Sequence, residues 1–145
     1  MENPSVTSKP SKLKLDFKES KYATGRRKTS IAKVWLKKGS GKIYVNGKIY
    51  SDYFANDNHK MQITRPFEII NQPTEYDVRC SVKGGGPTGQ AGAMVHGISK
   101  ALVLFDGNLK TKLKTEKLTT RDSRAVERKK PGRRKARRSF QFSKR

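Results

Sequence analysis

Clusters of arginine and lysine are the residues of this sequence with the clearest chemical use. The segment Thr24–Ser30 groups three cations with three hydroxyls and one glycine, and the last twenty-five residues hold twelve Lys or Arg against two acids. Such side chains bind phosphates, because neutralising a phosphate releases the counterions condensed on a nucleic acid. Both clusters therefore predict contact with a polyanion.

The C-terminal residues have the composition of a segment that becomes ordered on nucleic acid. From Pro131 onward there is no acid and no apolar period, so no face exists that could be buried in a fold of its own. Just before this stretch, Asp122 and Glu127 are expected to orient or cap the neighbouring arginine and lysine side chains rather than to bind RNA. The phosphate contacts predicted around them are Arg124, Arg128, Lys129 and Lys130.

Two phenylalanines alternate near the end of the chain, Phe140 and Phe142. One interpretation is that their rings stack on exposed bases. The other is that they pack against the folded core or a neighbouring protein. The sequence leaves both open.

A run of three glycines, Gly84–Gly86, separates an alternating segment from an amphipathic one. Bare backbone amides at the start of a helix attract phosphate, so the run resembles a nucleotide-binding loop. The Walker lysine and hydroxyl are missing, however, and the second glycine of a dinucleotide fingerprint is not at its spacing. A tight structural turn and a site for an RNA backbone phosphate are the two interpretations left.

No combination of residues predicts catalysis or a metal site. His59 and His96 have no partner at metal or triad spacing, and the acids are scattered, so no enzyme, cofactor or metal is expected. The single cysteine, Cys80, excludes an internal disulfide and falls in an alternating segment. It is expected to be a buried structural thiol in a reducing compartment.

The elements that must position these residues follow from the hydrophobic pattern. Tyr76–Val82 alternates and predicts a strand with one buried face, and apolar residues then recur at helical spacing from Thr88 to Leu104. The β-rich runs Ile31–Leu36 and Lys42–Val45 predict an antiparallel hairpin, with a turn signal at Asn46-Gly47. Further short helices are expected within residues 52–71 and 108–118.

Length and charge divide the chain into three parts. With 145 residues and 32% hydrophobic content, one modest domain is expected at residues 21–118, between a polar flexible extension at 1–20 and a basic tail at 119–145. The net charge of +22 is spread as +1, +8 and +13 over residues 1–20, 21–106 and 107–145. A chain that is basic throughout is typical of a protein embedded in RNA. No apolar run is long enough to cross a bilayer, and residues 1–20 are a poor match to a transit peptide.

Several motifs together resemble the family of small-ribosomal-subunit protein nine, in its bacterial and organellar form. They follow one another in order from Tyr22 to Arg145. The motifs are Tyr22–Lys28, Gly84–Ala93, His96–Ile98, Lys100–Leu102, Arg121–Arg124 and Gln141–Arg145. The resemblance implies one two-layer α+β domain with a four-stranded sheet, backing helices and a left-handed βαβ crossover, plus an extended basic tail.

The same resemblance implies a structural constituent of the small ribosomal subunit, bound to rRNA in the head and touching peptidyl-site tRNA with its tail. Neighbouring head proteins are further expected partners, without membrane contact or homo-oligomer. Together with the charge pattern, it gives as rRNA contacts Arg26, Arg27, Lys28, Gly84, Gly85, Gly86, Arg121, Arg124, Arg128, Lys129, Lys130, Arg133, Arg134, Lys135, Arg137 and Arg138. The implied tRNA contacts are Ser143, Lys144 and Arg145.

The origin and one competing function stay open at this stage. Likeness to the α-proteobacterial form, without a transit peptide, makes the mitochondrial matrix the first choice and the bacterial cytoplasm the alternative. A free basic protein that compacts nucleic acid would have the same charge and tail. Such a protein has no need of the strand, long helix and glycine run that this chain contains, and the ribosomal interpretation accounts for both features.

Overall fold

The computed structural model describes residues 18–144, so nearly all of the extension expected at residues 1–20 lies outside the described residues. Five strands and four helices follow one another along the described chain. The strands are β1 Lys21–Arg27, β2 Ser30–Lys38, β3 Ile43–Val45, β4 Lys48–Ile49 and β5 Tyr76–Lys83. The helices are α1 Tyr50–Tyr53, α2 Asp57–Ile69, α3 Pro87–Phe105 and α4 Leu109–Thr115. This is a mixed α+β domain, as expected.

The strands form one mixed sheet in the order β1-β2-β5-β3-β4. Neighbours pair antiparallel except for β3 and β5, which are parallel and are connected through α1 and α2. The expected count of four strands is therefore wrong by one. The additional strand, β4, has two residues and is too short to show a period in the sequence.

The predicted hairpin between Ile31–Leu36 and Lys42–Val45 is also wrong, because β5 lies between β2 and β3. The Asn46-Gly47 turn instead joins β3 to β4, with φ of +49° and +84° at its two residues, as a tight two-residue hairpin requires. The wrong pairing was predicted because the two runs are neighbours in the sequence. In the structure β2 pairs instead with β5, which is longer than β3 and matches β2 from Ile31 to Lys38.

Another difference concerns Thr24–Ser30, which precedes the first strand predicted from the sequence, Ile31–Leu36, and was not assigned to a strand. Most of it is β1, which pairs with β2 along its whole length and turns at Lys28-Thr29. Arginine, lysine and glycine have low strand propensity, so nothing local indicated a strand. Pairing with β2 and packing against α3 decide the conformation here.

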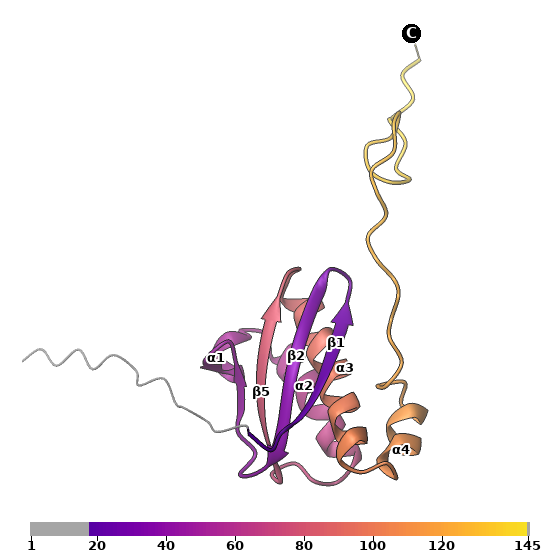
Figure 1. Cartoon of the computed structure of the whole chain (residues 1–145). Coiled ribbons are helices and arrows are strands. Elements are labelled where there is room, and N and C mark those ends of the chain that lie inside the picture. The colour runs from indigo at the N-terminus through magenta and orange to yellow at the C-terminus, as the bar shows by residue number, and fades with distance from the viewer. Residues whose placement is uncertain (1–17, 145) are drawn as a thin grey trace, which may run out of the picture.

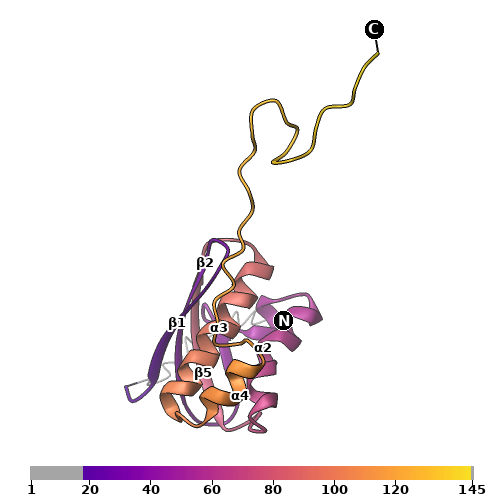
Figure 2. The same ribbon diagram turned by 90° about the vertical axis from the view of Figure 1, so that its right-hand side faces the viewer.

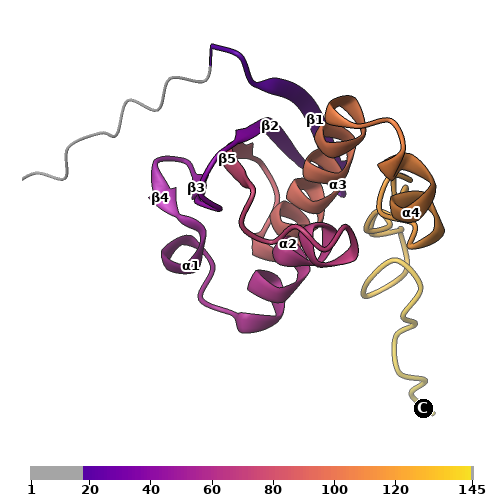
Figure 3. The same ribbon diagram turned by 90° about the horizontal axis from the view of Figure 1, so that it is seen from below.

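The sheet and helices form two layers. Figures 2 and 3 show α2, α3 and α4 on one face of the sheet. The other face, which none of these three helices covers, is called the open face. Alternate strand residues point into the helical layer, where fully buried side chains such as Val34, Leu36, Val78 and Ile98 form the core. Helix α3 matches the predicted span closely, begins with Pro87 in its first turn and is followed by Gly107. The predicted helices within 52–71 and 108–118 are α1, α2 and α4.

Cys80 is buried in β5, as predicted, and burial raises the pKa of its thiol to about 12. A thiol with so high a pKa stays protonated and is a poor nucleophile at neutral pH. Cys80 is therefore a core residue.

The C-terminal tail leaves the domain after α4 and extends away from it (Figure 1). It contains no helix or strand from Arg121 to Lys144. Phe142 is 87% exposed and Phe140 is 60% exposed, and the Arg134 guanidinium lies 5.8 Å from the ring centre of Phe140. In this structure neither phenylalanine packs against the core, which removes that alternative and leaves bases or a neighbouring protein.

Candidate nucleic-acid interface

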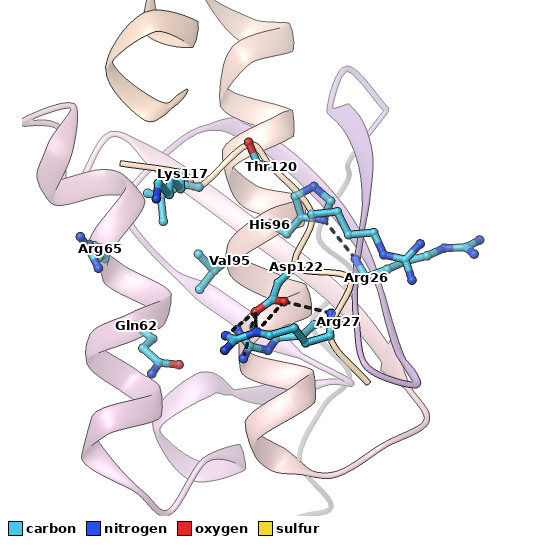
Figure 4. Close-up of a pocket in the computed structure, with 13 residues that line it drawn as sticks. Arg26, Arg27, Gln62, Arg65, Val95, His96, Lys117, Thr120 and Asp122 are labelled. Atoms are coloured by element: carbon cyan, nitrogen blue, oxygen red, sulfur yellow. Dashed lines mark hydrogen bonds and ion pairs between the residues drawn. The ribbon is translucent and has the colours of Figure 1, made fainter. Parts of the chain in front are cut away.

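An open pocket of ≈ 500 Å³ lies where the start of the tail crosses α3 beside β1 (Figure 4). Its wall also includes α2, so four parts of the chain contribute. Six of its lining residues are cations and one is an acid. The lining residues are Arg26, Arg27, Gln62, Arg65, Gly92, Val95, His96, Lys117, Leu118, Thr120, Arg121, Asp122 and Arg124.

The position of Arg27 depends on a glycine of α3. Arg27 ends β1 and points toward the helical layer (Figure 4). There its side chain passes over Gly92. A Cβ at Gly92 would lie 2.3 Å from Arg27 Cδ, so only glycine gives the side chain this path. The Nε of Arg27 is buried and has no hydrogen-bond partner. A buried guanidinium N–H without a partner is uncommon in folded proteins and is a cost that the close approach of Arg27 to Gly92 carries.

Asp122 pairs with two arginines from distant parts of the sequence. Its carboxylate accepts from the Arg124 side chain, with Nη2 at 2.9 Å and Nε at 3.1 Å, and lies 3.4 Å from Arg27 Nη2. The hydrogen bonds from Arg124, together with the nearby Arg27, hold the pKa of Asp122 well below its usual range. The carboxylate therefore stays ionised and holds the two guanidinium groups together, which fits the orienting role predicted for it.

Glu127 plays a similar part farther along the tail. Its carboxylate accepts from Arg137 Nε and Nη2 at 2.9 and 2.8 Å, and these hydrogen bonds lower the pKa of Glu127. The pair closes a loop in the tail whose backbone is also tied by Arg134 N donating to the Arg138 carbonyl at 2.8 Å. The nine residues between the paired side chains are thereby gathered into one cationic loop.

Neither histidine forms part of a catalytic arrangement. His96 is half-buried, and its Nδ1 accepts from the backbone N–H of Arg26 at 3.3 Å, which requires that nitrogen to be unprotonated. Burial lowers the pKa of His96, and the charges of Lys100 and Arg121 lower it further. His59 Nε2 lies 3.2 Å from the Thr88 hydroxyl. Both rings have structural hydrogen bonds, and no cluster of metal ligands occurs within residues 18–144.

The glycine run packs against the β1–β2 hairpin turn, where Lys28 lies near Gly89, about one helical turn before Gly92 of the pocket. Gly84 and Gly85 have φ of +77° and +63°, and a Cβ at Gly85 would lie 2.1 Å from Ser30 Oγ. These two glycines are therefore needed by the turn itself, which packs against the β1–β2 hairpin. At Gly86 a Cβ would meet nothing within 4 Å, so this residue leaves the first turn of α3 accessible.

The predicted site residues thus fall into three groups. Arg26 and Arg27 line the pocket together with Arg121 and Arg124, although the two pairs are nearly a hundred residues apart in sequence. Lys28 lies beside the glycine run, with its Cδ 3.7 Å from where a Cβ of Gly89 would be. The remaining residues follow the exposed tail, and Arg145 lies outside the described residues. They are Arg128, Lys129, Lys130, Arg133, Arg134, Lys135, Arg137, Arg138, Ser143 and Lys144.

Two pocket cations were not predicted from the sequence, Arg65 of α2 and Lys117 after α4. Arg65 Nη2 lies 2.7 Å from Glu116 Oε2, a contact that fastens α2 to the segment after α4. In the sequence Arg65 has no other cation within four residues, and Lys117 belongs to the lysine-rich stretch Lys110–Lys117, which was not assigned a contact. Only the tertiary contact shows that they share a pocket with Arg27.

Among residues 18–144, none of the helices combines the length and apolar character that a bilayer span requires.

Comparison with known protein families gives a match over most of the chain. A family model described as ribosomal protein S9/S16 matches residues 25–145, from within β1 to the end of the basic tail. This range contains both cationic clusters, the glycine run and the pocket. The chain therefore belongs to the ribosomal protein S9/S16 family, whose members are structural, non-enzymatic components of the small ribosomal subunit with rRNA and ribosomal proteins as partners.

Proposed function

We propose that this chain anchors itself to small-subunit rRNA in the head through its pocket and tail, and touches the peptidyl-site tRNA with its tail tip. The observation that supports the pocket most directly is Asp122, which holds Arg27 and Arg124 side by side. Two adjacent guanidinium groups match the geometry of phosphate oxygens.

The glycine run and Lys28 form a second phosphate site in this proposal. The exposed end of α3 at Gly86 presents backbone N–H groups, and the Lys28 ammonium stands beside it on the hairpin turn. Helix N-termini attract anions through these groups and through the helix dipole. Gly84 and Gly85 shape the turn, and Gly86 is the residue proposed to approach the RNA backbone.

The tail supplies the third contact. Its cations from Arg128 to Arg138 are exposed and carry no fixed apolar packing, so rRNA phosphates are their proposed ligands. Ser143, Lys144 and Arg145 are proposed to reach the tRNA. Because an extended chain spans up to about 3.5 Å per residue, the fifteen residues from Pro131 reach roughly 50 Å at most. That length separates the anchoring site from the tRNA-contacting tip.

Three finer points belong to the same proposal. The crossover from β3 to β5 is expected to be left-handed, as in the family, and the chain is expected to act without a second copy of itself. The mitochondrial matrix is the first choice of compartment, with the bacterial cytoplasm as the alternative. Fractionation of the source cells, followed by detection of the protein in mitochondrial or cytoplasmic ribosomes, decides between the two.

The test of rRNA anchoring is a salt titration. Replacing Arg26, Arg27 and Lys28 together by Ala is expected to weaken binding to a head-domain rRNA fragment and to flatten the log–log salt slope by up to about three phosphate equivalents. The matched control replaces Lys110, Lys112 and Lys114 of α4, which are exposed and outside the proposed sites, and removes the same charge. Unfolding curves establish that both variants are folded.

Equal slopes for the wild type and the Arg26–Lys28 variant would exclude these residues from the interface. If the variant and its control lose equal amounts of rRNA affinity, the pocket cations contribute only through the overall positive charge of the protein. Such an outcome would favour a compaction protein without a fixed RNA site.

A further inference from the structure

The open face of the sheet carries one continuous row of large side chains. Strand pairing aligns Tyr22 with Trp35, Trp35 with Arg79, Arg79 with Tyr44, and Tyr44 with Ile49. The row therefore crosses all five strands at a single level of the sheet. Opposed side chains on one face lie close enough to touch.

Contacts within the row are those of a stacking surface. The rings of Tyr22 and Trp35 have their centres 5.3 Å apart with a 44° tilt, and the Arg79 guanidinium carbon lies 5.7 Å from the centre of Trp35. Tyr22 is 46% and Ile49 48% exposed, while Trp35 and Tyr44 are half-buried by their neighbours. Because α2, α3 and α4 lie on the other side of the sheet (Figures 2 and 3), none of the three covers this row.

The residues beside the row are polar or cationic. One neighbouring level holds Thr24, Lys33 and Ser81, and the next holds Arg26, Ile31 and Lys83. No acid occurs at these two levels or in the row. Four cations therefore surround the aromatic rings, which is the charge that phosphates require.

The nearest carboxylate of β5 belongs to Asp77, and it is already engaged. Its Oδ1 accepts from the backbone N–H groups of Ser40 and Lys42, both at 2.9 Å. Asp77 is buried, so its charge serves the β2–β3 connection. It does not make the open face attractive to a basic partner.

We propose that this face is a platform for single-stranded RNA, on which unpaired bases stack against Tyr22 and the Arg79 guanidinium while Lys33 and Lys83 neutralise the adjoining phosphates. Bases stack on aromatic rings and on guanidinium planes, and open sheets bind single strands in this manner. The inference rests on the proposed RNA binding and adds a ligand class and a second surface to it.

The composition favours RNA over a protein partner. Protein interfaces are depleted in lysine and other charged residues at their centres. Here Lys33 and Lys83 stand among the exposed aromatic and aliphatic residues, and burying them against protein would cost desolvation without a paired acid on this face. A backbone phosphate beside each stacked base removes that cost.

Trp35 makes the platform directly measurable, since it is the only tryptophan of the chain. The full chain is titrated with an oligouridine of about eight nucleotides, a length within the usual range of single-strand sites. Trp35 fluorescence reports the platform, and anisotropy of the labelled oligonucleotide reports binding anywhere on the protein. An abasic oligomer of equal length separates bases from phosphates.

The expected result is a saturable change in Trp35 fluorescence with oligouridine and a much smaller one with the abasic oligomer. Tyr22→Ala is expected to shift the fluorescence midpoint about tenfold, whereas Tyr22→Phe keeps the ring and the midpoint. Lys33→Ala weakens the response more than Lys112→Ala, which removes the same charge from α4. Trp35 emission in the free variants establishes that the sheet is intact.

Binding seen by anisotropy without any fluorescence change, or equal responses to both oligomers, would overturn the platform and leave the pocket and tail proposals standing. Crosslinking of the Tyr22 face to a protein in assembled subunits, with no crosslink to rRNA, would also overturn it. The opposite combination is also decisive. If the Arg26–Lys28 variant keeps both its Trp35 fluorescence response to oligouridine and the wild-type salt slope, the platform is supported and the pocket is excluded as an RNA site.

Discussion

Gly25 lies at the closest approach of strand β1 to helix α3. A Cβ at this position would stand 1.8 Å from the Ala93 carbonyl oxygen and 2.4 Å from Gly97 N. Both are backbone atoms of α3, so they cannot move aside as a flexible side chain would. The approach of β1 to α3 holds Arg27 over Gly92, and the pocket therefore depends on this contact.

Gly25→Ala is accordingly expected to destabilise the domain by about 3 kcal/mol, near the upper end of the usual cost of overpacking. Chemical denaturation gives the free energy of unfolding. Gly107→Ala is the matched control, because its Cβ meets nothing within 4 Å and its cost is expected to be within about 0.5 kcal/mol. If the two variants unfold at the same denaturant concentration, the tight packing of β1 on α3 is wrong.

Single residues also mark the limit of what sequence predicts about the site. Arg26, Arg27, Arg121 and Arg124 stand in conspicuous clusters, and the sequence alone was enough to predict them as phosphate contacts. The pairing of Asp122 with Arg27 was not, because it joins residues on β1 and the tail. Arg65 has no cationic neighbour in sequence and enters the pocket only through the packing of α2.

Among the elements, the β2–β3 connection depends on one buried acid. Burial alone would raise the pKa of Asp77, but hydrogen bonds from Lys42 and Ser40 outweigh it and leave the pKa below its ordinary 3.8. An acid whose pKa falls on folding adds stability at neutral pH, and this contribution is lost as the pH drops through the folded-state pKa. The affected range lies below about pH 4.

Asp77→Asn retains an acceptor oxygen and removes only the charge. It is expected to cost about 1–2 kcal/mol at pH 7, the usual difference between charged and neutral acceptors. Urea denaturation of both proteins from pH 7 to pH 2 measures the cost, which is expected to shrink below about pH 4. A difference that stays constant down to pH 2 would show that the Asp77 charge is not stabilising the connection.

Elements with a strong period were predictable, and those fixed by tertiary pairing were not. Tyr76–Val82 alternates and Thr88–Leu104 repeats at helical spacing, so β5 and α3 were recognised. Strand β1 was missed because its cations and glycine favour no strand locally. The wrong hairpin arose because β5, from a later part of the chain, inserts between two strands that are neighbours in sequence.

At the scale of the whole molecule, the proposed rRNA contacts and the proposed tRNA contact lie in different parts of the chain. The cationic pocket belongs to the domain, and the tail projects beyond it with its cations exposed (Figures 1 and 2). Deleting Lys144 and Arg145 therefore leaves all proposed rRNA contacts in place. Small subunits are expected to assemble normally with the truncated chain.

The central claim is that the tail tip holds tRNA while the rest of the chain holds rRNA. The most direct test compares peptidyl-site tRNA dissociation from purified small subunits containing either the full chain or the chain lacking Lys144 and Arg145. Losing two exposed charge-assisted contacts is expected to cost about 1–3 kcal/mol, so tRNA is predicted to dissociate roughly five to a hundred times faster. Equal dissociation rates at several salt concentrations would contradict the claim and would leave the tip with rRNA alone.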